Sequence, residues 1–414
     1  MTFEKLQDIA LVVPGTSPKG ELINSAGLGL PFFQGSKEFN ELYPVPERYT
    51  EFPVKVANNG DVLISVRAPV GEVNIAQEDC SIGRGVMSVR AKNKSEQIFL
   101  FYFLKSLQGK WDSLGSTGSV FENLSTVALN NVEIPVGLKR VAIGEILFKL
   151  DQKIASNRAL SKTLEDIAQT LFKSWFMDFD PVKAKMAGEK PAGMDAATAA
   201  LFPDSMVESE LGLIPKGWCI ATVKSLTRTL VGGTPSRVRE DFWNGDIPWF
   251  NSGKVNEFRI IEPSEYITEL GLQKSAAKLL PIGTTVLAIT GATLGQYSRV
   301  EISASGTQNV IGILESDSIS NEYIYSFIAS GISRIVAAGT GGAQQHINKD
   351  IVDNFEFIFP GKNLVDMFTL NVGSMFQQIS LLTFNSRNLS RLRDALLPRL
   401  ISGELQIPKE MLAS

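Results

Sequence analysis

The chain of 414 residues has few of the residue types on which many catalytic and metal sites depend. Cys80 and Cys219 are its only cysteines and lie far apart, so they can form neither a disulfide framework nor a four-cysteine zinc site. His346 is the only histidine, which excludes a histidine-rich metal site and leaves one candidate for a histidine-dependent triad. This composition is typical of a cytoplasmic protein.

Further absences narrow the function. No apolar run approaches the roughly 18 residues that mark a membrane span, and the N-terminus does not have the pattern of a signal peptide, so we expect no membrane partner. The chain has no GxxxxGK phosphate loop, which argues against a P-loop NTPase. Its net charge of −4 lacks the basic excess common in nucleic-acid-binding proteins, although a whole-molecule sum can hide a local basic face.

What the chain does contain is a long heptad-like segment, 140–176, without proline. A helix of this length would extend roughly 55 Å, too long for an ordinary globular helix without a partner of similar length. Apolar residues recur in steps of three and four, which predicts a buried seam. The positions predicted to form it are Ile143, Leu147, Leu150, Ile154, Asn157, Leu160, Leu164, Ala168, Leu171 and Trp175.

A second segment, 363–401, repeats the pattern and is the expected partner. Its predicted seam contains Leu364, Phe368, Met375, Leu382, Leu389, Leu392 and Leu396, interrupted by the polar residues Asn371, Gln378 and Asn385. If the two helices pair antiparallel, Asn157 lies within about two turns of Asn385. A polar pair there would fix the register of the helices.

The segments before the two helices look like copies of each other. An apolar strand followed by a small-residue turn and glycine occurs at 60–71 and again at 283–295. The segments 131–133 and 354–356 match at the same shift in residue number. The order and spacing predict an internal duplication.

The predicted fold class is therefore α+β, with two similar domains in tandem joined by two long helices that pair as an antiparallel coiled coil, giving a pseudo-twofold internal repeat. Between the first helix and the second domain we expect a tether with one short helix near 196–201. The predicted parts are a first domain at 1–138, a central long helix at 139–177, a linker at 178–214, a second domain at 215–360, a distal long helix at 361–402 and a C-terminal tail at 403–414.

Two similar domains on a rigid link suit DNA, because two short sites separated by a fixed spacer need such a link. Arg can contact guanine, and Asn or Gln can contact adenine, through two hydrogen bonds, whereas Lys and Ser more often hold phosphates. For any single residue a solvated surface position is the more frequent role. The candidate DNA-binding residues are Ser17, Lys19, Arg67 and Arg84 in the first domain, and Thr234, Ser236, Arg237, Arg239, Asn251, Ser252, Lys254, Gln308 and Asn309 in the second.

One loop of the second domain, 231–239, combines these polar residues with Gly232 and Gly233. Its glycines would let backbone N–H groups approach a phosphate. By contrast, His346 has no serine or cysteine beside it in sequence, and a structural turn is favoured over catalysis there. Asp178 and Asp180 are too few for a metal site and are interpreted as structural. We expect no catalytic residue and no metal ligand.

Four local patterns and the duplicated architecture identify a family. The patterns are LFKSWFMDFDP at 171–181, GMDAATAALFP at 193–203, LGLIPKGW at 211–218 and LLPRLISG at 396–403. With them the chain resembles the specificity subunit of Type I restriction-modification enzymes. The resemblance covers nearly the whole chain, but the recognition domains of this family vary widely, so no base contact transfers residue by residue.

The resemblance implies two target-recognition domains that each bind one half of a bipartite site in double-stranded DNA. The helix pair would set the spacer and dock two modification subunits, which carry S-adenosylmethionine and methylate adenine. Separate restriction or motor subunits would use ATP and Mg²⁺. This non-catalytic chain would hold no cofactor, in agreement with its lack of the methyltransferase tetrapeptide Asn/Asp-Pro-Pro-Tyr/Phe.

Alternatives remain at this level. The chain could be a protein-binding scaffold, a self-contained methyltransferase or nuclease, or part of a restriction system of another type with a similar subunit. Both predicted domains carry slightly more acidic than basic residues. We therefore expect most of the affinity for the phosphate backbone to come from the modification subunits, and the isolated chain to bind DNA weakly.

Overall fold

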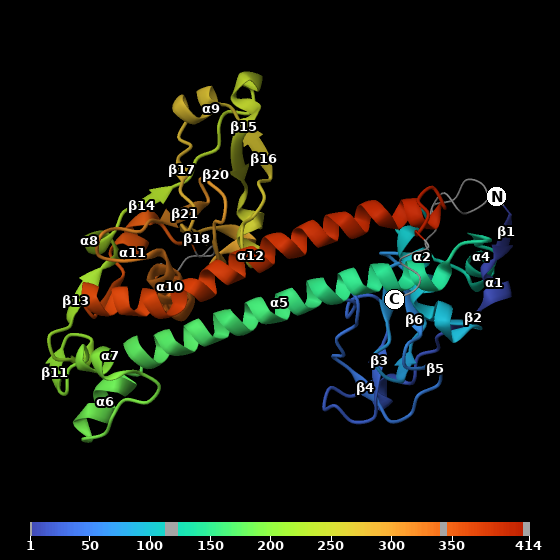
Figure 1. The fold of residues 1–414 in the computed structure, drawn as a ribbon, viewed down its shortest axis with the longest axis horizontal. Coiled ribbons are helices and arrows are strands. Elements are labelled where there is room, and N and C mark those ends of the chain that lie inside the picture. Colours follow the sequence, from blue (N-terminus) through green and yellow to red (C-terminus); the bar gives the residue numbers. More distant parts are fainter. Residues whose placement is uncertain (1, 112–122, 340–345, 409–414) are drawn as a thin grey trace. The chain divides into compact units, whose positions relative to one another are not determined.

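The computed structural model describes residues 2–111, 123–339 and 346–408 (Figure 1). It divides into two compact units, the first comprising Met1–Ser156 with Ser386–Ser414 and the second Asn157–Asn385. The long helices α5 (Arg140–Phe176) and α12 (Lys362–Ile401) each contribute one part to each unit. Of the C-terminal tail predicted at 403–414, residues 409–414 lie outside the described part of the chain.

The first unit contains two four-stranded sheets, ordered β2-β9-β6-β7 and β4-β3-β8-β5, and the two-stranded ladder β1-β10. Buried, β-branched stretches such as Val62–Ser65 explain the strands, since all four residues of this strand are buried. The elements are β1 (Phe3–Lys5), α1 (Leu6–Ile9), β2 (Ala10–Pro14), η1 (Gly20–Leu22), β3 (Leu30–Phe33), β4 (Tyr49–Thr50), β5 (Val56–Ala57), β6 (Val62–Ser65), β7 (Val73–Ile75), β8 (Cys80–Ile82), β9 (Val86–Ala91), η2 (Lys94–Glu96), α2 (Gln97–Ser106), α4 (Thr126–Asn130) and β10 (Glu133–Pro135).

The second unit repeats this topology strand for strand, as β14-β21-β18-β19, β16-β15-β20-β17 and β13-β22. The predicted internal repeat is thereby confirmed. The elements are β13 (Cys219–Thr222), α8 (Val223–Leu226), β14 (Thr229–Val231), η3 (Glu240–Phe242), β15 (Trp243–Phe250), η4 (Ser252–Asn256), β16 (Glu265–Ile267), α9 (Glu269–Gln273), β17 (Leu279–Leu280), β18 (Thr285–Ala288), η5 (Gly291–Thr293), β19 (Tyr297–Arg299), β20 (Ala304–Gly306), β21 (Val310–Ile313), α10 (Asn321–Ala337), α11 (Lys349–Asp353) and β22 (Glu356–Phe359).

The segment between α5 and the second set of sheets is more structured than a tether. The predicted short helix is present as α7 (Ala196–Ala200), but α6 (Asp180–Met186) and the hairpin of β11 (Met206–Ser209) with β12 (Gly212–Pro215) accompany it. Phe179, Val182 and Phe202 of this segment belong to the core of the second unit. The predicted tether with one short helix therefore contains more structure than expected, because these apolar side chains give the segment a surface to bury.

The two long helices pack along each other within both units. In the first unit, the N-terminal part of α5 shares a core with the C-terminal part of α12, through Ile143 and Leu147 with Leu397, Leu400 and Ile401. In the second, the C-terminal part of α5 shares a core with the N-terminal part of α12, through Ala168, Phe172 and Trp175 with Leu364, Val365, Phe368 and Val372. The helices are therefore antiparallel, as predicted.

The phase of the seam differs from the heptad prediction. On α5, Asn157 is 2% exposed as expected, but Leu160 is 45% exposed and Ser161 takes the buried position. On α12, the three predicted polar seam positions are all exposed, and Val372, Ile379 and Ser386, each one residue later, are buried instead. Phe368, Val372 and Phe376 are buried at two successive steps of four residues, so the buried positions that follow lie one residue later than an unbroken heptad predicts. A buried Asn157–Asn385 pair is wrong for this reason.

A buried ionic group fastens each part of the helix pair to its own unit. In the first unit, Tyr102 Oη on α2 donates to Asp151 Oδ2 on α5 at 2.5 Å, and the Arg393 guanidinium on α12 binds the other carboxylate oxygen. We call Tyr102, Asp151 and Arg393 the first anchor. Burial, followed by the nearby Asp151 charge, raises the pKa of the Tyr102 hydroxyl, so it stays a hydrogen-bond donor.

The second unit has a comparable group, which we call the second anchor. The fully buried side chain of Arg259 donates to Glu165 Oε1 on α5 at 3.2 Å and to Tyr325 Oη on α10 at 2.9 Å. Glu301 continues the network, because it binds Arg299 at 2.9 Å and accepts from Ser380 Oγ on α12 at 2.8 Å. Both long helices are thus tied to the sheets of this unit by charge as well as by apolar packing.

Asp151→Asn tests the first anchor. Removing one charge of a buried pair leaves Arg393 with only the exposed Asp394 as its counterion, and we expect a loss of about 3 kcal/mol in the free energy of unfolding. The matched control is Asp166→Asn on the same helix, whose exposed i,i+4 pair with Lys162 predicts a loss below about 0.5 kcal/mol. Urea unfolding of both variants measures the difference. Equal losses in the two variants would contradict the anchoring role of Asp151.

Candidate nucleic-acid interface

In the first unit the ends of four strands bring the candidate residues together. β2 and β6 both pair antiparallel with β9, so they run in the same direction, and β3 runs parallel to β8. The Thr16 N–H donates to the Ile82 carbonyl at 2.9 Å, and the Val66 N–H donates to the Gly85 carbonyl at 2.9 Å. These bonds join the loops after β2, β6 and β8, which carry Ser17, Arg67 and Arg84.

Ser17 is the centre of this group. Its Oγ donates to Gln34 Oε1 at 3.0 Å and accepts from the backbone N–H of Arg84 at 3.2 Å. Gly83 allows the close approach, because a Cβ there would lie 2.8 Å from Gln34 Oε1 and 2.9 Å from Ser17 Oγ. The structure therefore unites two predicted residues, Ser17 and Arg84, and adds Gln34. We call Ser17, Gln34 and Arg84 the first corner.

The second unit has an equivalent corner, identified by its backbone hydrogen bonds. Gly15 N–H donates to the Val86 carbonyl as Gly232 N–H does to that of Val310, both at 3.0 Å. In the same way, the Gly83 N–H donates to the Phe33 carbonyl in the first unit, and the Thr307 N–H donates to the Phe250 carbonyl in the second. The correspondence pairs three residues of each unit. We call Thr234, Asn251 and Gln308 the second corner, in the order that matches Ser17, Gln34 and Arg84.

This correspondence shows how Gln34 could have been found. Asn251 was a candidate from sequence, and the internal repeat places Gln34 opposite it. The match was not visible in the sequence, because few residues around 34 are identical in the two copies. In addition, the difference in residue number between corresponding positions is not the same in the early strands as in the late ones.

Hydroxyl groups hold the second corner as well. The Thr234 hydroxyl donates to Gln308 Oε1 and lies 3.2 Å from Thr307 Oγ1, which itself donates to Gln308 Oε1 at 3.1 Å. Asn251 Oδ1 accepts from the Gly253 N–H at 2.9 Å and begins η4. Thr234 and Gln308 therefore lie in direct contact.

The candidate cations of the second unit are engaged by carboxylates. Arg237 pairs with Glu265 at 2.6 Å and stacks 3.7 Å from the centre of the Trp243 ring. Arg239 binds Asp241 through two hydrogen bonds, and Lys254 pairs with Glu257 at 2.7 Å. These partners reduce the positive charge available to DNA.

The first unit differs in this respect. Lys19, Arg67 and Arg84 are exposed, and within the described ranges their side chains make no hydrogen bond or ion pair. The cations of the first unit are thus the more available ones for a phosphate or a base.

The remaining candidates have mixed surroundings. Ser236 is exposed and its carbonyl accepts from Trp243 Nε1 at 3.2 Å. Ser252 is half-buried in η4, and the carbonyl of half-buried Asn309 accepts from Ile289 N–H at 3.0 Å.

The prediction that the glycine N–H groups of the 231–239 loop approach a phosphate is wrong. The N–H groups of Gly232 and Gly233 already donate to the carbonyls of Val310 and Gly306, and a Cβ on either would meet backbone within 2.3 Å.

Catalytic chemistry finds little support among the described residues. Burial raises the pKa of the Cys80 thiol to about 12, so the nucleophilic thiolate is absent at neutral pH. His346 is exposed, and residues 340–345 before it lie outside the described part of the chain. Asp178 pairs with Lys173, and Asp180 accepts a hydrogen bond from Ser174. The described residues contain no group of three or more His, Cys, Asp or Glu that could hold a metal ion. Within the same ranges no helix is long and apolar enough to cross a membrane.

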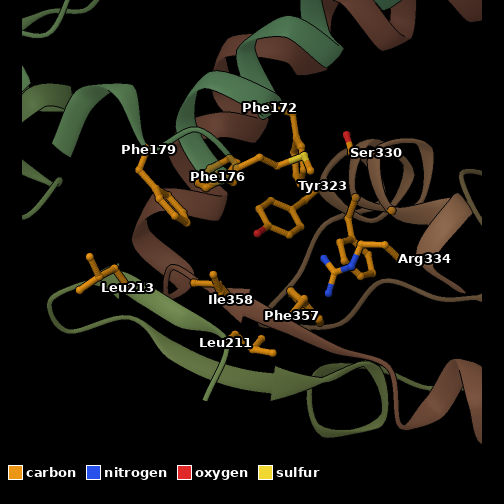
Figure 2. A pocket seen from close by; sticks show the side chains of 13 residues that line it. Phe172, Phe176, Phe179, Leu211, Leu213, Tyr323, Ser330, Arg334, Phe357 and Ile358 are labelled. Carbon is orange, nitrogen blue, oxygen red and sulfur yellow. The ribbon is translucent and has the colours of Figure 1, made fainter. Parts of the chain in front are cut away.

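A cavity of about 340 Å³ in the second unit also gives little support for catalysis. Figure 2 shows Phe172, Phe176 and Tyr323 around it, with side chains from the β11–β12 hairpin on another side. Ser330 and Arg334 are the polar side chains at its edge besides the Tyr323 hydroxyl, and its lining contains no carboxylate, histidine or cysteine. Without a carboxylate, histidine or cysteine the cavity lacks a partner that could activate the Ser330 hydroxyl as an active site does.

Residues 1–166 and 215–364 match the family described as Type I restriction modification DNA specificity domain. The Type I restriction enzyme HindI specificity subunit of Haemophilus influenzae is 28% identical over 327 residues, covering 69% of this chain and 70% of that protein. The MjaIX specificity subunit of Methanocaldococcus jannaschii is 25% identical over 420 residues, covering 98% of this chain and 93% of that protein.

A solved structure shares the fold. The S subunit of a Type-I restriction-modification system from M. genitalium superposes with a TM-score of 0.60 at 16% identity, covering 97% of this chain and 96% of that one. The two segments that match the family fall on the two copies of the duplicated domain and cover well over half of the chain. This chain therefore belongs to the family of Type I restriction-modification DNA specificity subunits.

Proposed function

We propose that this chain directs a Type I restriction-modification complex to a bipartite target in double-stranded DNA, with one half bound by each unit. As a member of its family the chain recognises DNA and is the non-catalytic subunit. The observation that carries the bipartite target is the duplication itself. The same strand order occurs twice, and the same strand ends carry a polar corner in each copy. Two equivalent surfaces on one chain suit two half-sites.

We further propose that the helix pair sets the spacer between the half-sites. The anchors support this role. The first fastens α5 and α12 to α2, which packs against β6 and β9, and the second fastens them to α10 and to Arg299 of β19. A rigid attachment of this kind would pass the length of the helices on to the DNA-binding surfaces. The domain limits predicted from sequence remain part of this proposal.

An exposed apolar stripe on the helix pair supports docking of modification subunits. Leu160 and Ile167 of α5 lie one heptad apart and are 45% and 46% exposed. Ile167 also lines a groove of about 610 Å³, together with Leu171 of α5 and Met375 of α12. Apolar residues at helical spacing in a groove between two helices suit a partner helix.

The chemistry of the complex belongs to other subunits in this proposal. Two modification subunits would bind S-adenosylmethionine and methylate adenine, and restriction or motor subunits would use ATP and Mg²⁺. The alternative of a protein-binding scaffold is not adopted, because no feature of the described residues favours a protein over DNA at the two corners. The alternative of a self-contained methyltransferase or nuclease is set aside by the family, whose members are specificity subunits.

Methylation mapping tests the bipartite target. The chain is expressed with its modification subunit in a host that lacks adenine methylation, and the genome is sequenced for N6-methyladenine. We expect one motif with two short halves around a fixed gap. A single continuous motif, or no new methylation despite a stable complex, would count against the proposal.

Binding by the purified chain alone tests the source of affinity. Because the candidate cations of the second unit are paired with carboxylates, we expect weak binding to duplex DNA at physiological salt. The expected dissociation constant is roughly micromolar or weaker, and addition of modification subunits should tighten it. Fluorescence anisotropy on the target duplex, with and without the partner, measures both. Tight binding by the chain alone would contradict this expectation.

Ile167→Asp tests the docking stripe. A charge placed in an apolar interface should weaken the complex with the modification subunit by roughly tenfold or more. The control is Ala155→Asp, also exposed on α5 but about 120° around the helix from Ile167. Co-purification and analytical ultracentrifugation compare the two variants. If both variants assemble as the unchanged chain does, the stripe is not the docking surface.

A further inference from the structure

The same type of contact occurs at equivalent positions in both corners. Ser17 and Thr234 correspond to each other, and each donates its hydroxyl hydrogen to the side-chain oxygen of a glutamine. The glutamines themselves come from different strand ends, since Gln34 follows β3 and Gln308 follows β20. The hydroxyl therefore stands at the equivalent position in both copies, whereas the glutamine that it binds comes from a different loop in each copy.

This contact fixes which end of the amide faces outward. A glutamine amide has an oxygen that accepts and an NH₂ group that donates. When a hydroxyl donates to the oxygen, the NH₂ group points away from that hydroxyl. Among the described residues, the NH₂ groups of Gln34 and Gln308 have no hydrogen-bond acceptor. Each corner therefore presents amide donors, and its amide oxygen already accepts a hydrogen bond from a hydroxyl.

The effect is strongest at Gln308. Its Oε1 receives hydrogen bonds from both Thr234 and Thr307, which occupy both lone pairs of the oxygen. The two-bond contact with adenine expected from the residue type requires this oxygen to accept from adenine N6. Gln308 cannot make that contact while the two threonines hold its oxygen.

The first corner presents donors for a second reason. Arg84 has only donors on its side chain, and it is exposed. Ser17 also accepts from the Arg84 backbone N–H at 3.2 Å, so one hydroxyl positions both the amide of Gln34 and the start of the arginine side chain. The donors of Gln34 and Arg84 therefore share one organising residue.

We infer that Ser17 and Thr234 are positioning residues that turn each corner into a donor surface for the acceptor atoms of a base edge. The inference rests on the proposed function. The matching atoms in the major groove are guanine O6 and N7, adenine N7 and thymine O4, whereas the amino groups of cytosine and adenine find no free acceptor at the oxygen of Gln308. Phosphate oxygens have the same acceptor chemistry, and the experiment separates them from bases.

The experiment uses the complete complex with its modification subunits and N6-methyladenine mapping. Thr234→Val removes the hydroxyl at nearly constant shape and frees one lone pair of the Gln308 oxygen, while Thr307 still donates to the other. We expect discrimination at one base position to fall roughly tenfold, in one half-site alone. Ser17→Ala should do the same at one position of the other half-site.

Conservative variants and a neighbouring control separate orientation from simple structural damage. Thr234→Ser and Ser17→Thr keep the hydroxyl, so both should retain the unchanged motif. Thr16→Val, next to Ser17, exposed and without a side-chain hydrogen bond to a described residue, should also retain it. Thermal unfolding of every variant shows whether it is folded, and Gln308→Leu, which removes the amide at an exposed site, supplies a second test of the same position.

Three results would overturn the inference. The first is an unchanged motif in Thr234→Val and Ser17→Ala. The second is a uniform loss of methylation at all sites, which would assign the amides to phosphates. The third is a Thr234→Ser variant that loses specificity as Thr234→Val does. Failure of the proposed function is a separate result, because the unchanged complex would then produce no bipartite motif.

Discussion

The antiparallel packing of α5 against α12 is the interaction on which the rest of the structure depends. Neither unit has a complete core without it, because Leu147 and Leu397 belong to the core of the first unit and Phe172 and Phe368 to that of the second. The anchors also fix the rotation of α5 about its own axis. A carboxylate on α5 meets an arginine and a tyrosine in each unit, which ties the rotation of α5 to the neighbouring helix, α2 in the first unit and α10 in the second.

The two copies share their backbone framework but differ in the side chains at the ends of the strands. Identical strand orders and identical backbone hydrogen bonds place the same strand ends together in both units. The side chains at those ends differ, with Arg84 in one copy where the other has Gln308. Because a loop after a strand carries few backbone bonds of the sheet, its side chains can change without disturbing the pairing of the strands.

Charge and hydrogen bonding distinguish the two copies further. The cations near the second corner are neutralised by Glu265, Asp241 and Glu257, whereas those near the first corner are exposed and unpaired among the described residues. Each corner nevertheless uses a hydroxyl to hold an amide oxygen. A common arrangement of backbone and hydroxyl therefore supports two surfaces of different charge.

Periodicity was enough to predict the long helices, because it depends on the spacing of apolar residues along the chain. The order and spacing of matching segments predicted the repeat and favoured the pairing of the two helices. The phase of the seam could not be predicted in this way, since two successive steps of four residues between Phe368 and Phe376 move the buried face from Asn385 to Ser386. Gln34, the ion pairs of Arg237 and Arg239 and the use of the Gly232 N–H group followed only from the folded chain. Each depends on which loops the sheets bring together, and that choice is made by contacts between residues distant in sequence.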